Sequence, residues 1–114
     1  MRLEARKYLL DIQVAADRIG RFTQGKSFQQ YLADEMLRSA VERQFEIVGE
    51  ALSRLSKEDA GIATAIPDHA RIIAFRNILI HGYAMVDDRI VWGVIENYLA
   101  QLRAAVKRLL ETPD

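Results

Sequence analysis

The chain has 114 residues, 50% of them hydrophobic, and its 16 basic and 16 acidic side chains give a formal net charge of +0. This length is typical of one compact domain, here residues 1–114, and the neutral total argues against a protein that coats nucleic acid through overall positive charge. The absence of cysteine excludes disulfides and cysteine nucleophiles, and the lack of a long apolar run or a signal-peptide pattern favours a cytoplasmic protein without a membrane segment.

Apolar residues at helical spacing predict a first helix within residues 5–19, and the stretch TQGKS ends it. A second, longer helix is predicted to start at Ser27, because Ser27 and Gln30 have the spacing of a capping box. Its apolar positions continue to Leu55. Since roughly 25 or more residues is long for a helix in a globular domain, the second segment allows for a break near Asp34.

The third predicted helix begins at the stretch IPDH and continues to His81. Pro67 suits the first turn of a helix, and Asp68 places a negative charge near the positive end of the helix dipole. Gly82 follows the last apolar residues, at the position where helices commonly end with glycine. We therefore expect this helix to start at this stretch, with Pro67 in its first turn, and to end beside a histidine.

The last predicted helix starts at an N-cap, Asp87 or Asp88, and its apolar positions extend to Leu109. No stretch of the sequence alternates polar and apolar residues with period two, and no proline interrupts the middle of a periodic segment. The predicted fold class is therefore all-α, an antiparallel bundle of four to five helices joined by short connections.

The end of the third helix, RNILIHGY (residues 76–83), gathers side chains that could act on a phosphodiester. Arg76 offers a permanent positive charge and a planar fork that fits a phosphate, and His81 has a side chain whose ordinary pKa suits proton transfer near neutral pH. Asn77 and His81 are one helical step apart and share a face. Arg76 and His81 are five residues apart, which separates them by about 140° around an ideal helix. One helix alone therefore makes a poor site from this pair.

The same residues also permit a purely structural interpretation. His81 could cap the carbonyl groups at the helix end, Arg76 could form a surface ion pair, and Tyr83 could pack on a neighbouring helix. A pattern as short as Arg-(x)4-His-x-Tyr arises easily by chance, so the motif alone does not decide between catalysis and structure.

Longer stretches resemble one protein family in the same order along the chain. RNILIHGY resembles the R-x-x-x-x-H-x-Y signature of the HEPN superfamily, specifically of HepT-like toxins from prokaryotic toxin–antitoxin pairs. AVERQFEIVGEAL (residues 40–52) is similar to the long second helix of these proteins, and DDRIVWGVIENYLAQL (residues 87–102) to the start of their last helix. The resemblance covers most of the chain after residue 27. It implies an all-helical, dimerising bundle in which two signatures meet in a shared cleft.

The resemblance implies the toxin component of such a pair, an endoribonuclease that cuts RNA without a metal or other cofactor. By the same likeness Arg76 and His81 are the catalytic residues. His81 would move a proton as the RNA 2′-hydroxyl attacks, and Arg76 would hold the phosphate. Asn77 would orient one of them, and Glu50 would support the site by pairing with Arg76.

The resemblance also implies a partner and a regulatory modification. In systems of this kind a small nucleotidyltransferase antitoxin, MntA, transfers AMP to the signature tyrosine, which corresponds to Tyr83 here. The added phosphates would occupy the space and charge intended for RNA. The predicted partners are RNA, an MntA-like nucleotidyltransferase and a second copy of the chain, with higher oligomers left open.

A second hypothesis keeps the fold and removes the catalysis. The chain would then be a helical interaction or nucleotide-binding module that dimerises, binds its nucleotidyltransferase partner and receives AMP without cutting RNA. Trp92 and Tyr98 fit a core or a dimer interface in either case, and His69 fits a capping or surface position. With two histidines and no Glu-x-x-His pattern, we expect no metal site.

Two glutamates one helical step apart, Glu46 and Glu50, also have a structural interpretation. Such pairs usually lie on a solvated helix face, and here Arg43 and Arg54 could balance their charge. Gly49 lies between the two glutamates in the sequence and, having no side chain, permits a close approach of two helices.

Overall fold

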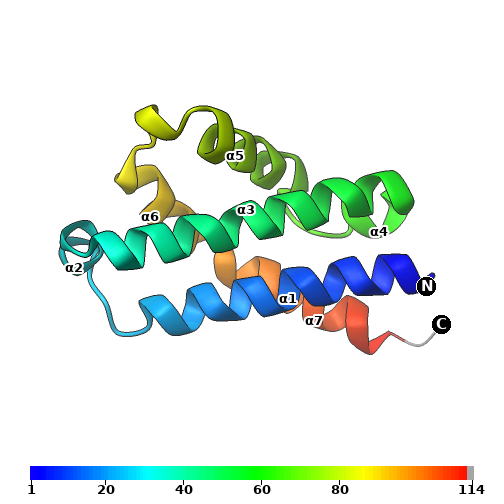
Figure 1. Ribbon diagram of the computed structural model, residues 1–114. Coiled ribbons are helices and arrows are strands. Elements are labelled where there is room, and N and C mark those ends of the chain that lie inside the picture. The colour runs from blue at the N-terminus through cyan, green and yellow to red at the C-terminus, as the bar shows by residue number, and fades with distance from the viewer. Residues whose placement is uncertain (113–114) are drawn as a thin grey trace.

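The computed structural model describes residues 1–112, which form helices and connecting loops without a strand, so the predicted all-α fold class is confirmed (Figure 1). Within these residues there is no helix with the length and hydrophobicity that a membrane crossing requires. The elements in chain order are α1 (Leu3–Thr23), α2 (Phe28–Ala33), α3 (Glu35–Glu58), α4 (Ala60–Thr64), α5 (His69–His81), the short 3₁₀ helix η1 (Tyr83–Met85), α6 (Asp88–Asn97) and α7 (Leu99–Glu111).

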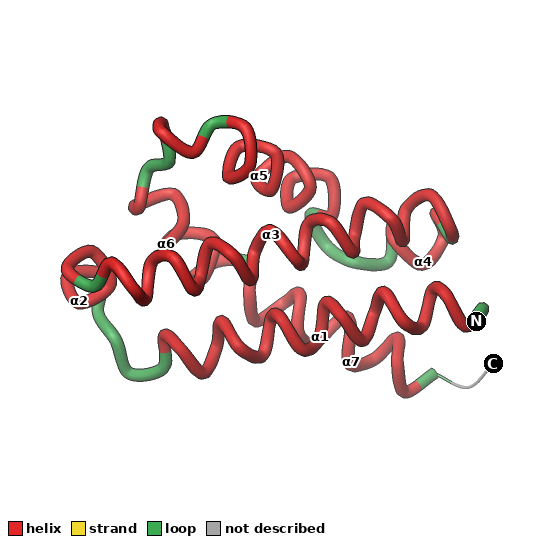
Figure 2. The backbone as a smooth tube through the Cα atoms, in the orientation of Figure 1, coloured by secondary structure: helices red, strands yellow, loops and turns green. Residues whose placement is uncertain are grey.

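Two long helices, α1 and α3, run antiparallel side by side along the molecule (Figures 1 and 2). α7 packs on α1 and α5 packs on α3, while the short helices α2 and α4 lie at opposite ends of α3. Polar contacts tie α7 to α1: Arg6 Nη1 donates to the Leu110 carbonyl at 3.3 Å, and Arg103 Nε donates to Asp17 Oδ1 at 2.9 Å. The α1–α3 pair therefore forms the centre of the bundle, and the other helices pack around it.

The core lies where the predicted apolar faces of α1 and α3 meet. Leu9, Ile12 and Ile19 of α1 are fully buried, as are Phe45 and Leu52 of α3. Spacings of three and seven residues place these side chains on one face of each helix. A fully buried side chain of this size contributes about 1.5–3 kcal/mol, so the α1–α3 seam is a main source of stability.

Aromatic side chains join α2 to α6. The ring of Trp92 lies 5.3 Å from that of Tyr31 and 6.3 Å from that of Phe28, measured between ring centroids. Tyr31 is fully buried, and burial, reinforced by the negative charges of Glu42 and Asp88, raises the pKa of its phenol. Trp92 packs against the core, which is one of the two positions predicted for it.

The capping box and the break in the second predicted helix are both confirmed. Ser27 Oγ accepts from the Gln30 N–H at 3.1 Å, and Gln30 Oε1 accepts from the Ser27 N–H at 2.8 Å. Asp34 is extended (φ −110°, ψ 96°), ends α2, and caps α3 by accepting from the Leu37 N–H at 3.0 Å. The segment divides into α2 and α3 because this side-chain acceptor competes with the helical backbone.

The third predicted helix begins within the stretch IPDH, since α5 starts at His69, but the prediction that Pro67 lies in its first turn is wrong. The unpredicted helix α4 precedes it, and Ile66 between them is fully buried. Burial of Ile66 holds the chain in a turn that contains Pro67. Asp68 is left-handed (φ 59°), and its side chain makes no capping hydrogen bond to α5.

The other end of α5 lies where it was predicted. The helix ends at His81, and Gly82 is its C-cap. The Gly82 N–H donates to the Ile78 carbonyl at 2.8 Å and so satisfies one of the last helical acceptors. Gly82 has φ −111°, so the left-handed conformation common at such glycines is not used.

The last predicted helix begins as expected and is then broken. Asp87 is the N-cap, with Oδ1 accepting from the Arg89 N–H at 2.9 Å. The single helix predicted to Leu109 is wrong, because Tyr98 (φ −125°, ψ −26°) separates α6 from α7. Just before this break, Asn97 Nδ2 donates to the Gly93 carbonyl at 2.9 Å and competes with the backbone for that acceptor.

Candidate active site

α5 crosses α3 at Gly49, where the two helices approach closely. A Cβ atom at Gly49 would lie 2.2 Å from Cβ of Arg76 and 2.6 Å from its Cγ, both far shorter than ordinary contacts. The predicted role of Gly49 in close packing is confirmed. The stem of Arg76 therefore lies against bare α3 backbone, and its side chain is only 23% exposed.

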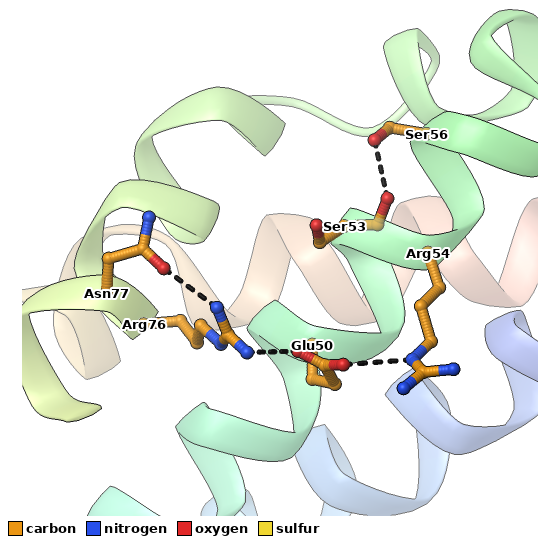
Figure 3. A network of polar contacts seen from close by, with 6 residues as sticks. All are labelled: Glu50, Ser53, Arg54, Ser56, Arg76 and Asn77. Atoms are coloured by element: carbon orange, nitrogen blue, oxygen red, sulfur yellow. Dashed lines mark hydrogen bonds and ion pairs between the residues drawn. The ribbon is translucent and has the colours of Figure 1, made fainter. Parts of the chain in front are cut away.

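The guanidinium of Arg76 is held by two neighbours (Figure 3). Its Nη2 donates to Glu50 Oε2, and its Nη1 donates to Asn77 Oδ1 at 2.8 Å. Glu50 Oε1 in turn accepts from Arg54 Nε at 2.9 Å. The structure thus contains the Glu50–Arg76 contact expected from the resemblance and the Glu50–Arg54 pair expected from helical spacing.

These contacts set the charge state of Glu50. The hydrogen bond from Arg54 lowers the pKa of Glu50; partial burial opposes the shift, and the positive charge of Arg76 adds to it. Glu50 is therefore ionised at neutral pH and acts there as an acceptor. Arg76 keeps further donors uncommitted, among them a buried Nε without a hydrogen-bond partner within residues 1–112.

His81 and Tyr83 lie beyond this network. His81 is the last residue of α5 and is exposed, and within residues 1–112 its imidazole makes no hydrogen bond or ion pair. Tyr83 opens η1 and is 78% exposed. Neither the capping role considered for His81 nor the packing role considered for Tyr83 occurs in the described part of the chain, and both side chains are accessible.

A cleft of about 440 Å³ lies between α1, α3 and α5. It is bordered by apolar residues and by four basic and three acidic side chains, namely Lys7, Arg43, Arg54, Arg76, Asp11, Glu46 and Glu50. His81 does not border it. One chain therefore brings Arg76 and Glu50 together in a cleft and leaves His81 outside, as the angular separation on the helix predicts.

Two features of this region have no counterpart among the sequence predictions. Tyr8 of α1 borders the cleft, and no spacing rule relates it to RNILIHGY. An apolar groove also lies between α5 and α6, where Ile78 and Ile90 are 53% and 58% exposed. The stretch HARIIAFRNILIH has apolar residues on every side of the helix, a pattern that could have indicated an apolar face left uncovered by the single chain.

The remaining candidates lie away from the cleft. His69 is half-buried in the first turn of α5, and the Tyr98 hydroxyl accepts from Arg71 Nη1 at 3.1 Å beside the apolar groove. Residues 1–112 contain no group of three or more His, Asp or Glu side chains that could hold a metal ion.

Comparison of the sequence with known proteins identifies the family to which the chain belongs. Residues 12–109, which include Glu50 and the whole of RNILIHGY, match the family described as "Ribonuclease HepT-like". The chain belongs to the HepT-like family. The HEPN-type resemblance carried by three separate stretches of the sequence is thereby confirmed, together with the helical bundle that it implies.

Relatives of this HepT-like chain match it over nearly its whole length. The "Probable ribonuclease HepT" of Thermococcus cleftensis is 30% identical over 109 residues, which are 96% of this chain and 98% of the relative. A protein of Caldanaerobacter subterraneus subsp. tengcongensis, named as a candidate RNase, is 33% identical over 106 residues, which are 93% of this chain and 94% of the relative. No solved structure gives a significant match.

Proposed function

We propose that this protein is the toxin component of a toxin–antitoxin pair and cuts RNA as an endoribonuclease. Membership of the HepT-like family and the RNase names of its relatives support an RNA substrate. The observation that carries the site assignment is the arrangement of Arg76. Its guanidinium borders a cleft, is oriented by Glu50 and Asn77, and keeps one further N–H on each of Nη1 and Nη2 that a phosphate can use.

In the proposed reaction the 2′-hydroxyl of one nucleotide attacks the adjacent phosphate, and the bond from phosphorus to the 5′-oxygen breaks. His81 takes or returns the proton in this exchange, since an imidazole titrates near neutral pH. Arg76 binds the non-bridging oxygens and stabilises the charge of the transition state. Asn77 orients Arg76 through its hydrogen bond. Side chains supply both the proton transfer and the positive charge, so the reaction proceeds without metal or cofactor.

Two copies of the chain complete the proposed site. His81 lies outside the cleft that Arg76 borders, and a two-fold dimer can place the histidine of one subunit beside the arginine of the other. The exposed side chains of Ile78 and Ile90 supply apolar area next to α5 for such a contact. Dimers could associate further without changing this arrangement.

The proposal predicts RNA cleavage by the purified protein in excess EDTA, with products ending in 2′,3′-cyclic phosphate and 5′-hydroxyl groups. End-labelled RNA of mixed sequence on a denaturing gel gives the readout, and His81→Ala purified in parallel controls for contaminating nuclease. Cleavage by the wild type alone supports the proposal. Equal cleavage by both proteins contradicts the site, and absence of cleavage by either favours the non-catalytic interaction module.

The proposed inhibitor is an MntA-like nucleotidyltransferase that transfers AMP from ATP to the Tyr83 hydroxyl and releases pyrophosphate. Tyr83 is 78% exposed and follows His81 by two residues, so its hydroxyl is accessible close to the proposed proton-transfer group. Each phosphate added there carries negative charge, which repels the RNA backbone. Modification of Tyr83 would thus block the site without unfolding the protein.

Tyr83→Phe is expected to cut RNA like the wild type but to escape inhibition by the nucleotidyltransferase and ATP, because it keeps the ring and lacks the acceptor oxygen. Mass spectrometry of the intact proteins is expected to detect added AMP on the wild type and none on the variant. Tyr98→Phe is the matched control and is expected to remain modifiable. AMP on the Tyr83→Phe protein would refute the assignment of Tyr83.

A further inference from the structure

One carboxylate, that of Glu50, lies between two guanidinium groups (Figure 3). Oε1 of Glu50 accepts from Arg54 Nε at 2.9 Å, and Oε2 accepts from Arg76 Nη2. Each arginine therefore contacts a different oxygen of Glu50, and Arg76 contacts only one of the two carboxylate oxygens. Exposure increases along this series, from 23% for the side chain of Arg76 to 39% for Glu50 and 61% for Arg54.

The contact through one oxygen matters because arginine and carboxylate groups favour a bidentate pair with two parallel N–H···O bonds. The second donor for such a pair is Arg76 Nε, on the same edge of the guanidinium as Nη2. Nε is buried and has no hydrogen-bond partner within residues 1–112. A buried donor without a partner is unfavourable, so an unoccupied Glu50 Oε1 would be drawn to it. A bidentate pair would neutralise more of the positive charge that Arg76 presents to a phosphate in the cleft.

Arg54 is in turn held beside Glu50. It follows Glu50 by four residues on α3, with the acidic residue N-terminal to the basic one, which is the favourable order for such a pair. The hydrogen bond with Glu50 raises the pKa of Arg54, and the neighbouring hydroxyl of Tyr8 adds to this shift. Tyr8 belongs to α1, so the packing of α1 on α3 helps to fix Arg54 at the cleft.

We propose that Arg54 is a positioning residue for Arg76: by occupying Oε1 of Glu50 it prevents a bidentate Glu50–Arg76 pair and keeps the positive charge of Arg76 available to an RNA phosphate. This inference rests on the proposed function, because it concerns the phosphate that Arg76 is proposed to hold. Arg54 acts through Glu50 and need not touch the reacting atoms.

Arg54→Met keeps a long apolar stem and removes the donors to Glu50. With an end-labelled RNA oligonucleotide of mixed sequence in EDTA, this variant is expected to raise KM about tenfold, the effect of one lost hydrogen bond to a charged group, with a much smaller change in kcat. Arg54→Lys is expected to recover most of the loss, because an ammonium group can still donate to Oε1. Arg103→Met is the matched control and should leave KM unchanged: Arg103 Nε donates to Asp17 Oδ1 at the same 2.9 Å, but outside the cleft.

A second background separates action through Glu50 from direct contact with RNA. In Glu50→Gln there is no carboxylate to pair with Arg76, so adding Arg54→Met is expected to leave KM unchanged. A tenfold rise in that background would mean that Arg54 binds RNA itself. No rise for Arg54→Met alone would mean that Arg54 does not control Arg76, and either result overturns the inference.

A measurement without RNA tests the role of Arg54 independently of whether the protein cuts RNA. Nitrogen-15 NMR of the Arg76 guanidinium, assigned with Arg76→Lys, reports how fast the group rotates, and a bidentate pair slows this rotation. Slower rotation in Arg54→Met than in the wild type supports the inference even if no variant cuts RNA, whereas identical spectra overturn it. Absence of wild-type cleavage, by contrast, refutes only the proposed function.

Discussion

Replacing Arg76 or His81 by alanine is expected to slow RNA cleavage by at least about a hundredfold, the usual loss when a charge-stabilising or proton-transferring group is removed. The fold is expected to survive both changes. His81 is exposed, and Glu50 keeps Arg54 as a partner when Arg76 is absent, so no charge is left alone. Cleavage of end-labelled RNA in EDTA measures the loss, and circular dichroism checks that the helical content is unchanged.

Mixing these two inactive variants tests whether subunits share the site. If each site takes its arginine and its histidine from different subunits, a mixed dimer has one site that lacks both groups and one that keeps both. Random pairing is then expected to restore roughly a quarter of the wild-type rate. No recovery after verified subunit exchange would place each site within one subunit, against the position of His81 outside the cleft.

Gly49→Ala is expected to reduce both activity and stability. The added Cβ would meet the stem of Arg76 at 2.2 and 2.6 Å, and a stem fixed to its helix cannot rotate away as a side-chain tip can. α5 must therefore move off α3, which lowers the free energy of unfolding by roughly 1–3 kcal/mol. The same movement displaces Arg76, and a misplacement of about 1 Å is sufficient for a roughly hundredfold loss of cleavage.

Gly20→Ala is the matched control, because Gly20 also lies within a helix and faces an arginine. There the added Cβ meets the guanidinium tip of Arg103, with Nη1 at 2.7 Å and Cζ at 3.3 Å, and this tip can rotate away. Alanine also favours the helix over glycine by about 1 kcal/mol, so stability is expected to hold or increase. Thermal unfolding followed by circular dichroism, together with cleavage measured well below the transition, compares the two. A Gly49→Ala protein with wild-type stability and activity would contradict the assigned crossing point.

The helical fold was predictable wherever local hydrogen bonds determine it. The capping box at Ser27 joins residues close in sequence, so their spacing was sufficient to predict it. The break near Asp34 was expected from the length of the helix, and the N-cap of the last helix was narrowed to Asp87 or Asp88. The position of Pro67 outside α5 was not predictable, because the turn that contains it depends on the burial of Ile66 by distant helices. The break at Tyr98 lacks a proline or glycine at the position itself, and the apolar periodicity continues across it.

The site was predictable only within one helix. The spacing of Arg76 and His81 predicted that one chain would not unite them, and the cleft indeed excludes His81. The pairing of Glu50 with Arg76 joins α3 to α5, and it was expected from the family resemblance rather than from spacing. Tyr8 was missed because its position near Arg54 results from the packing of α1, which no local pattern encodes.

Trp92 is the one tryptophan of the sequence, and the ring of Tyr31 lies 5.3 Å from it inside the bundle. At that separation an excited tyrosine passes its energy to the tryptophan, so the ultraviolet emission of the protein reports whether α2 and α6 remain docked. Neither ring borders the cleft that contains Arg76. Fluorescence of the protein can therefore distinguish a variant that has unfolded from one that is folded but no longer cuts RNA.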